Sequence, residues 1–145
     1  MAAPIERSIN SIIALVFGVT YTVVGVAGFF VIDYDRYAGK VGEPLIIFDV
    51  NFLHNIVHLL VGLGLIVASR RTATARATNF AIGVAYLALG ALGPVINDTA
   101  LDVFGLNGPD HLLHLGSGAL LVAVALFTDK AQRARARARE AGSRA

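Results

Sequence analysis

All four histidines of this chain lie on a polar stripe that occurs twice in apolar sequence. The first copy reads Phe48, Asn51, His54, Asn55, His58, Leu59 and Gly62, and the second reads Phe104, Asn107, Asp110, His111, His114, Leu115 and Gly118. The copies match position by position at an offset of 56 residues. The spacing places each copy along one face of a helix. Burying such groups is costly unless they pair with one another or bind something, so this polar stripe is the candidate functional site.

The polar stripe offers side chains of the kind that bind transition metals. His54 and His58 stand at i and i+4, and Asp110 and His114 have the same spacing. Side chains four residues apart on a helix can converge on one ion. Imidazole together with carboxylate suits zinc, iron, copper or manganese. We therefore predict a site for a transition metal ion such as zinc, copper or iron, with ligands drawn from His54, His58, Asp110, His111 and His114.

Other interpretations are open for the same residues. One is a hydrogen-bonded network across the helices, in which each bond contributes about 0.6–2 kcal/mol. Its supporting polar residues are Asn51, Asn55, Asn107, Tyr21 and Tyr86. Another is haem b, with His58 and His114 as axial ligands. A third is a path for protons or a substrate.

No catalytic motif indicates an enzyme. The sequence HNxxH from His54 to His58 lacks the glutamate of the zinc-protease helix. Cysteine chemistry is excluded because the chain has no cysteine.

The elements that must position the polar stripe are four apolar segments. Of the 145 residues, 56% are hydrophobic and only 15% are charged, whereas soluble domains carry about 25% charged residues. The apolar blocks approach the ~20 residues of a membrane helix, and they run over about Ile9–Ile32, Val50–Ala68, Thr78–Ile96 and His111–Phe127. We therefore predict an all-α membrane protein with four transmembrane helices, in one domain over residues 1–128 that is followed by a basic tail over 129–145.

A second repeat links the first and third blocks. The pattern GxxYxxxGxxG occurs in both at an offset of 65 residues, as Gly18, Tyr21, Gly25 and Gly28 and as Gly83, Tyr86, Gly90 and Gly93. The two repeats together predict two similar helical hairpins in parallel orientation, over about 8–69 and 77–128. Small residues let membrane helices approach closely, so we expect these glycines at helix contacts. The tyrosines fall near the depth of His58 and His114, which predicts two Tyr–His pairs in which the tyrosine hydroxyl meets the imidazole.

Charge is distributed unevenly along the chain. Ten of the twelve basic residues lie at Arg7, in the cluster Arg70, Arg71 and Arg76, or in the tail, whereas the opposite side holds Arg36, Lys40 and seven acidic residues. The positive-inside rule then places both termini in the cytoplasm and the polar stripe in the outer half. Basic residues beside a membrane attract anionic lipid at ~1 kcal/mol each, which makes anionic lipid a candidate partner of the tail. The net charge of +2 gives no support for nucleic-acid binding.

The motif N-x-x-H-N-x-x-H-L-x-x-G, from Asn51 to Gly62, and the early block from Gly18 to Gly28 resemble a bacterial family of four-helix integral membrane proteins known only as a domain of unknown function. The resemblance covers roughly residues 5–128. It implies a location in the inner (plasma) membrane and a four-helix fold, and it supplies no catalytic residue. The second copy has Asp110 at the position equivalent to His54, and this difference argues against two equivalent metal sites. We interpret the chain as a small binding or accessory membrane protein, alone, as a homo-oligomer or within a larger membrane complex.

The predicted topology can be tested with reporter fusions. Alkaline phosphatase fused after Gly39 or after Gly105 should be active, and a fluorescent protein fused at the C-terminus should be fluorescent, because basic flanks stay in the cytoplasm. Swapping the two reporters at each position provides the control. A cytoplasmic signal from either acidic connection would overturn the orientation.

Overall fold

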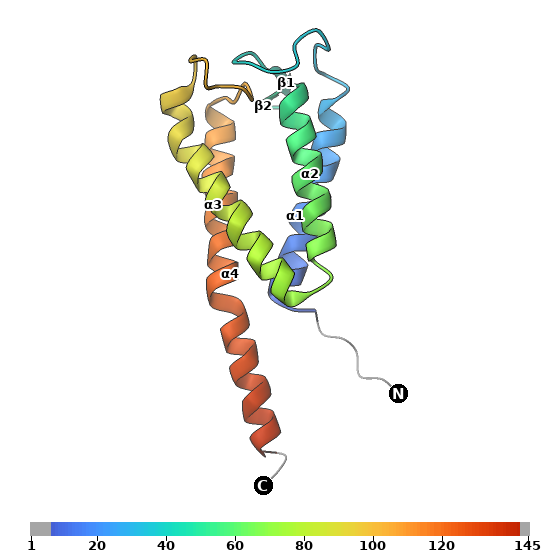
Figure 1. Ribbon diagram of the computed structural model, residues 1–145, viewed down its shortest axis with the longest axis vertical. Coiled ribbons are helices and arrows are strands. Elements are labelled where there is room, and N and C mark those ends of the chain that lie inside the picture. Colours follow the sequence, from blue (N-terminus) through green and yellow to red (C-terminus); the bar gives the residue numbers. More distant parts are fainter. Residues whose placement is uncertain (1–6, 143–145) are drawn as a thin grey trace.

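The computed structural model describes residues 7–142, apart from the side chains of residues 129–140. Its elements are, in chain order, α1 (Ile9–Gly28), β1 (Glu43–Leu45), β2 (Phe48–Val50), α2 (Phe52–Ala68), α3 (Thr72–Ile96) and α4 (Gly108–Gly142). Helix α1 packs along α2, and α3 packs along α4, so the helices form two pairs. Both long connections lie at one end of the bundle, and the start of α1 and the α2–α3 turn lie at the other (Figure 1).

Each of the four apolar blocks contains a helix, but the helices have other limits than the blocks predict, and α2 begins at Phe52 rather than near Val50. Helix α1 ends at Gly28 rather than near Ile32. Helix α3 begins at Thr72, six residues before the predicted Thr78, because alanine and arginine favour a helix even where the sequence is not apolar. The same propensity carries α4 through the alanine- and arginine-rich tail as far as Gly142. Apolarity therefore locates these helices but does not fix their ends.

The helices have the character of membrane-spanning segments. In the part of the chain that the structure describes, α1, α3 and the segment Gly108–Thr128 of α4 are long and apolar enough to cross a membrane. Helix α2 is apolar but has only 17 residues, about 25 Å at ~1.5 Å per residue. Large apolar side chains cover the outside of the bundle, among them Val23, Leu60, Val95 and Leu112. An apolar outer surface of this kind is what contact with lipid requires.

Glycines bring the helices of each pair into backbone contact. A Cβ atom built on Gly18 would lie 2.8 Å from the carbonyl oxygen of Gly62, and one on Gly83 would lie 2.9 Å from that of Gly118. Neither crossing has room for a side chain, so only glycine fits these positions. The two crossings fall at equivalent positions of the 65- and 56-residue repeats.

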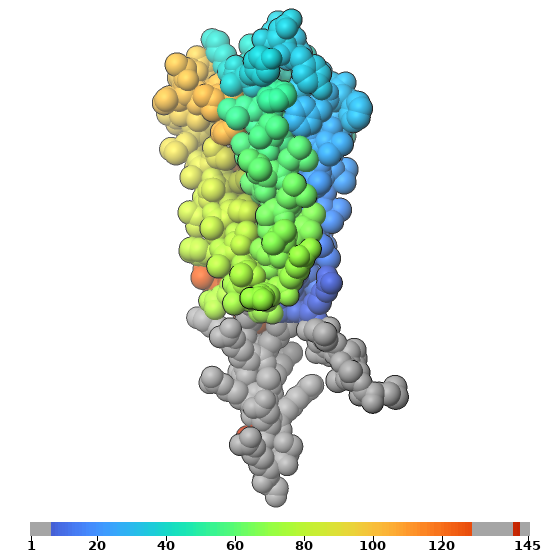
Figure 2. Space-filling view, turned by 45° about the vertical axis from the view of Figure 1, so that its right-hand side comes forward, coloured from blue at the N-terminus to red at the C-terminus, as the bar shows by residue number. Residues whose placement is uncertain are grey.

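A buried asparagine pair joins the two helix pairs at the end away from the long connections. The side-chain nitrogen of Asn79 donates to the backbone oxygen of Asn10 at 3.1 Å and to its side-chain oxygen at 2.9 Å. Asn10 in turn donates to the carbonyl oxygen of Val124 at 3.2 Å and to the hydroxyl of Thr128 at 3.1 Å. These bonds connect α1, α3 and α4. On the face shown in Figure 2, side chains fill the space between α2 and α3.

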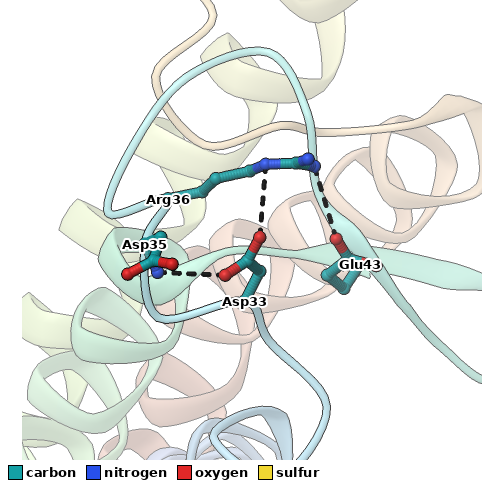
Figure 3. A network of polar contacts seen from close by, with 4 residues as sticks. All are labelled: Asp33, Asp35, Arg36 and Glu43. Atoms are coloured by element: carbon teal, nitrogen blue, oxygen red, sulfur yellow. Dashed lines mark hydrogen bonds and ion pairs between the residues drawn. The ribbon is translucent and has the colours of Figure 1, made fainter.

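The first long connection contains a small antiparallel sheet that the sequence did not predict. Strands β1 and β2 pair through a tight turn in which Ile46 has a φ of 66°. In the same connection, Arg36 lies 3.4 Å from a carboxylate oxygen of Asp33 and 3.6 Å from one of Glu43, and the backbone N–H of Asp35 donates to Asp33 at 3.0 Å (Figure 3). One of the two basic residues on this side is thus engaged by local carboxylates.

The two long connections are hydrogen-bonded to each other. The Asn51 side chain donates to the carbonyl oxygens of Gly39 at 3.2 Å and Val103 at 3.0 Å. The backbone N–H of Gly39 also donates to Val103 at 3.1 Å. The Asn107 side chain donates to the carbonyl oxygen of Ile47 at 2.9 Å. These bonds hold the connections together as one layer over the end of the bundle.

The glycine crossings can be tested by adding one methyl group. Gly62→Ala places a Cβ atom 2.6 Å from the backbone nitrogen of Thr22, and Gly118→Ala places one 2.8 Å from the oxygen of Gly83. Each substitution should cost about 1–3 kcal/mol, because the helices must move apart. Thermal unfolding of the detergent-solubilised protein measures the loss. Gly64→Ala is the matched control, since nothing lies within 4 Å of its added Cβ. Equal melting temperatures for Gly62→Ala and Gly64→Ala would contradict the packing.

Candidate metal centre

His54, His58 and His114 form a histidine cluster between the two helix pairs. One ring nitrogen of each lies within 4.8 Å of those of the other two, and the three side chains are only 3–6% exposed. The Nε2 atoms of His54 and His58 are 3.2 Å apart. Two nitrogen ligands of a tetrahedral zinc ion, each at ~2.0–2.1 Å, lie roughly 3.3 Å from each other. The spacing therefore suits a shared metal ion as well as a hydrogen bond.

The start of α2 determines how His54 is oriented. Asn51 caps the helix, because its side-chain oxygen accepts from the backbone N–H of His54 at 2.9 Å. The Nδ1 atom of His54 lies 3.2 Å from the carbonyl oxygen of Asp49. A carbonyl oxygen only accepts, so in neutral His54 this contact places the proton on Nδ1 and leaves a lone pair on Nε2. Metal-bound histidines have the same arrangement, with the second ring nitrogen held by a carbonyl or carboxylate.

Two tyrosines pack against the histidine cluster. The ring centroids of Tyr21 and His58 are 5.5 Å apart with nearly parallel planes, and those of Tyr86 and His114 are 4.8 Å apart, edge to face. The tyrosines also contact each other at 5.4 Å. The expected Tyr–His pairs are thus present, but they meet through their rings, and the Tyr86 hydroxyl finds no hydrogen-bond partner among the described residues. Aromatic pairs of this kind contribute about 0.5–1.5 kcal/mol each.

A small space adjoins the histidine cluster. Its volume is about 20 Å³, and its walls include His54, His58, His114 and Tyr86. A water molecule needs about 10–15 Å³, so the space has the size of one water molecule or one ion. This space by itself is far too small for a porphyrin. The geometry at this point favours an ion over haem.

Several buried polar atoms at this level of the bundle are unpaired within the described residues. They are both side-chain polar atoms of Asn55, the Tyr86 hydroxyl and the Nδ1 atoms of His58, His111 and His114. Native proteins pair the great majority of such atoms, and each unpaired atom costs about 1–3 kcal/mol. A hydrogen-bonded network complete in itself would leave fewer atoms unpaired.

Asp110 and His111 lie outside the histidine cluster. Asp110 accepts from the backbone N–H groups of Asn107 at 3.0 Å and Asp49 at 3.1 Å, while the Asn107 side chain accepts from the N–H of Asp110 at 3.1 Å. This reciprocal arrangement is a capping box at the start of α4. His111 Nε2 instead lies 3.2 Å from the side-chain oxygen of Asn97. The structure thus brings together three of the five predicted ligands.

Asn55 and His111 occupy equivalent positions of the two copies and have equivalent surroundings. The amide of Asn55 packs on Gly28 of α1, and the ring of His111 packs on Gly93 of α3. The two glycines are themselves equivalent in the 65-residue repeat. In both copies this position therefore faces the neighbouring helix of its own pair rather than the histidine cluster.

A cleft of about 460 Å³ reaches the histidine cluster from the side, between α1 and α4. His58 and His114 form part of its wall. Sequence periodicity did not predict it, because a cleft depends on side-chain volumes. Comparison of the two copies of the repeat could have indicated the cleft, because its wall has smaller side chains at two equivalent positions. Val24 and Val50 line the cleft, and their counterparts Leu89 and Leu106 line the 20 Å³ space.

The fold and the histidine cluster define a class of small helical membrane protein with histidines buried among its apolar helices. Residues 11–127 match the family described as Domain of unknown function (DUF4383), so the chain belongs to that family. The match confirms the resemblance based on the motifs from Asn51 to Gly62 and from Gly18 to Gly28. No curated protein and no solved structure matches the chain.

The role of Asp110 can be tested separately from metal binding. Asp110→Ala should lower the free energy of unfolding by about 0.5–2 kcal/mol, because the backbone N–H groups of Asn107 and Asp49 lose the carboxylate that accepts their hydrogen bonds. Thermal unfolding measures the effect, and Asp35→Ala, at an exposed position of the first connection, is the control. If Asp110→Ala instead removed a copurifying metal at unchanged stability, Asp110 would be a ligand rather than a cap.

Proposed function

We propose that this protein binds a single transition metal ion through His54, His58 and His114. The observation that carries the proposal is the convergence of one ring nitrogen from each histidine within 4.8 Å, beside a space of about 20 Å³. The contact of His54 Nδ1 with the carbonyl oxygen of Asp49 adds support, because the second ring nitrogen of a metal-bound histidine is usually held in this way.

The ligand types point to a restricted set of ions. Three imidazoles without a carboxylate suit zinc, copper or iron, and they do not suit calcium or magnesium, which prefer oxygen ligands. Three protein ligands also leave a coordination position open, as in catalytic zinc sites, whereas structural zinc sites are usually closed by four. An external molecule could therefore bind the ion directly.

The location of the site follows from the proposed topology. We infer that four helices span a bacterial inner membrane, that both termini are cytoplasmic and that the histidine cluster lies in the outer half. The long connections share one end of the bundle (Figure 1), and His54 lies only three residues after the Asn51 cap at that end. Helix α2 can span despite its 17 residues, because a bilayer thins around a short segment at modest cost. The equivalent glycine crossings support the two-hairpin repeat.

A second candidate is a purely structural network. The contact between His54 and His58 at 3.2 Å and that between His111 and Asn97, also at 3.2 Å, favour it. In this case the histidines would hold the two helix pairs together without any ion. The two candidates differ in metal content and in their response to a chelator.

The experiment is metal analysis of the purified, detergent-solubilised protein. We expect about one ion per chain, and removal of the ion by a chelator should lower the melting temperature, because a ligand of the folded state stabilises it by about 2.7 kcal/mol at 100 times its Kd. Acid should weaken binding, since imidazole must be neutral to bind a metal. His58→Ala and His114→Ala should each abolish binding.

His111→Ala is the matched control, because it removes a buried histidine outside the cluster and should leave the metal content unchanged. Metal-free wild-type protein that does not respond to a chelator would overturn the metal proposal. The network would then predict only a loss of about 1–3 kcal/mol in the His58 and His114 variants. A haem absorption band would overturn both proposals.

A further inference from the structure

The two halves of the bundle differ at the sides of the histidine cluster. Between α1 and α4 the cleft measures about 460 Å³, whereas the space lined by equivalent residues of α2 and α3 measures about 20 Å³. At two equivalent positions the cleft has valine, Val24 and Val50, where the small space has Leu89 and Leu106. The cavity is thus wide in one half of the bundle and narrow in the other.

The walls of the cleft show what kind of molecule would fit. Its volume lies in the range of ligand pockets, about 300–1,000 Å³. Apolar side chains of α1 and α4 make most of the lining, and the aromatic rings in it are Phe17, Tyr21, Phe48, His58 and His114. Planar rings stack favourably on aromatic side chains. A ligand with one flat ring and a long apolar tail would therefore match both parts of the lining.

Polar groups lie at one part of this wall. Ser117 donates its hydroxyl hydrogen to the carbonyl oxygen of Leu113 at 2.6 Å, so its oxygen lone pairs can accept another hydrogen bond. His58 and His114 lie in the same wall. The cleft opens between two helices long and apolar enough to cross a membrane, so its ligand would enter from the hydrocarbon layer.

We propose that the cleft binds a membrane-soluble quinone or quinol, with its ring against Tyr21, His58 and His114 and its apolar tail along α1 and α4. The proposal does not depend on a metal ion, because the walls of the cleft alone carry it. If an ion is bound as well, the ring would lie beside it, since His58 and His114 belong to both sites.

Tyrosine fluorescence offers a direct measurement. The chain has four tyrosines and no tryptophan, and two of the tyrosines, Tyr34 and Tyr37, are exposed in the first connection. In a Tyr34→Phe/Tyr37→Phe background, the emission comes from Tyr21 and Tyr86 at the cluster. A benzoquinone with a ten-carbon tail, titrated into lipid nanodiscs that hold this protein, should quench that emission with saturation.

Two variants fill the cleft without disturbing the fold. A Cβ atom on Gly116, which lines the cleft, has nothing within 4 Å, so Gly116→Phe can place its ring in the cleft. Val24→Leu installs the residue found at the equivalent position of the other half. Both should weaken binding of the quinone, Gly116→Phe by about tenfold or more. Gly64→Phe is the control, because Gly64 is equally free of neighbours and is not part of the cleft wall.

The outcomes separate the alternatives. Saturable quenching that is lost in Gly116→Phe and kept in Gly64→Phe supports the proposal. Quenching without saturation, equal in all variants, would mean that the quinone only partitions into lipid and would overturn it. Saturable quenching that Gly116→Phe leaves unchanged would place the quinone elsewhere and would also overturn it. Displacement of the quinone by palmitic acid at similar concentrations would show that the cleft takes acyl chains, and would overturn the ring-head proposal. None of these results depends on the metal content.

Discussion

The whole arrangement depends on backbone contact between helices at Gly18 and Gly62 and, in the second pair, at Gly83 and Gly118. Each crossing fixes the distance between two helices, and with it the meeting of the rings nearby. Tyr21 follows Gly18 by three residues and His58 precedes Gly62 by four, and Tyr86 and His114 have the same offsets in the second pair. A wider crossing would draw each tyrosine away from its histidine. The geometry of the aromatic groups is thus set by residues without side chains.

Hydrogen bonds hold the two helix pairs together at both ends. Asn10 and Asn79 bond at one end, and the bonded connections join the pairs at the other. A hydrogen bond across membrane helices contributes only about 0.6–2 kcal/mol, and between these ends the buried side chains of Ala14, Tyr21, Leu65, Ala75 and Tyr86 form a core shared by both pairs. The bundle can therefore tolerate a cleft of about 460 Å³ between α1 and α4.

Much of the fold could be predicted from the sequence, and part of the site. Apolar blocks locate membrane helices because lipid selects for them, and the i, i+4 spacing brings His54 and His58 together once α2 forms. The same spacing in Asp110 and His114 has another meaning, because Asn107 begins α4 and makes Asp110 part of a capping box. Spacing alone does not say where a helix starts, and so does not tell a cap from a ligand. The β1–β2 sheet depends on a turn at Ile46 that carries no turn signal, such as glycine or asparagine, at that position. Which side of the membrane each end faces stays a prediction.

The hydrogen bonds between the two long connections also limit the rate at which water or a solute could reach the histidine cluster through that end of the bundle. Asn51 bonds to both connections at once, and Asp110 joins the start of α4 to the strand before α2. Neither connection can lift alone without breaking bonds to the other. Access from this side therefore requires a joint local opening, and such openings occur over microseconds to seconds rather than at the nanosecond pace of a loop. Through this side of the bundle, a group held by the histidines would therefore exchange with water only as fast as the two connections open together.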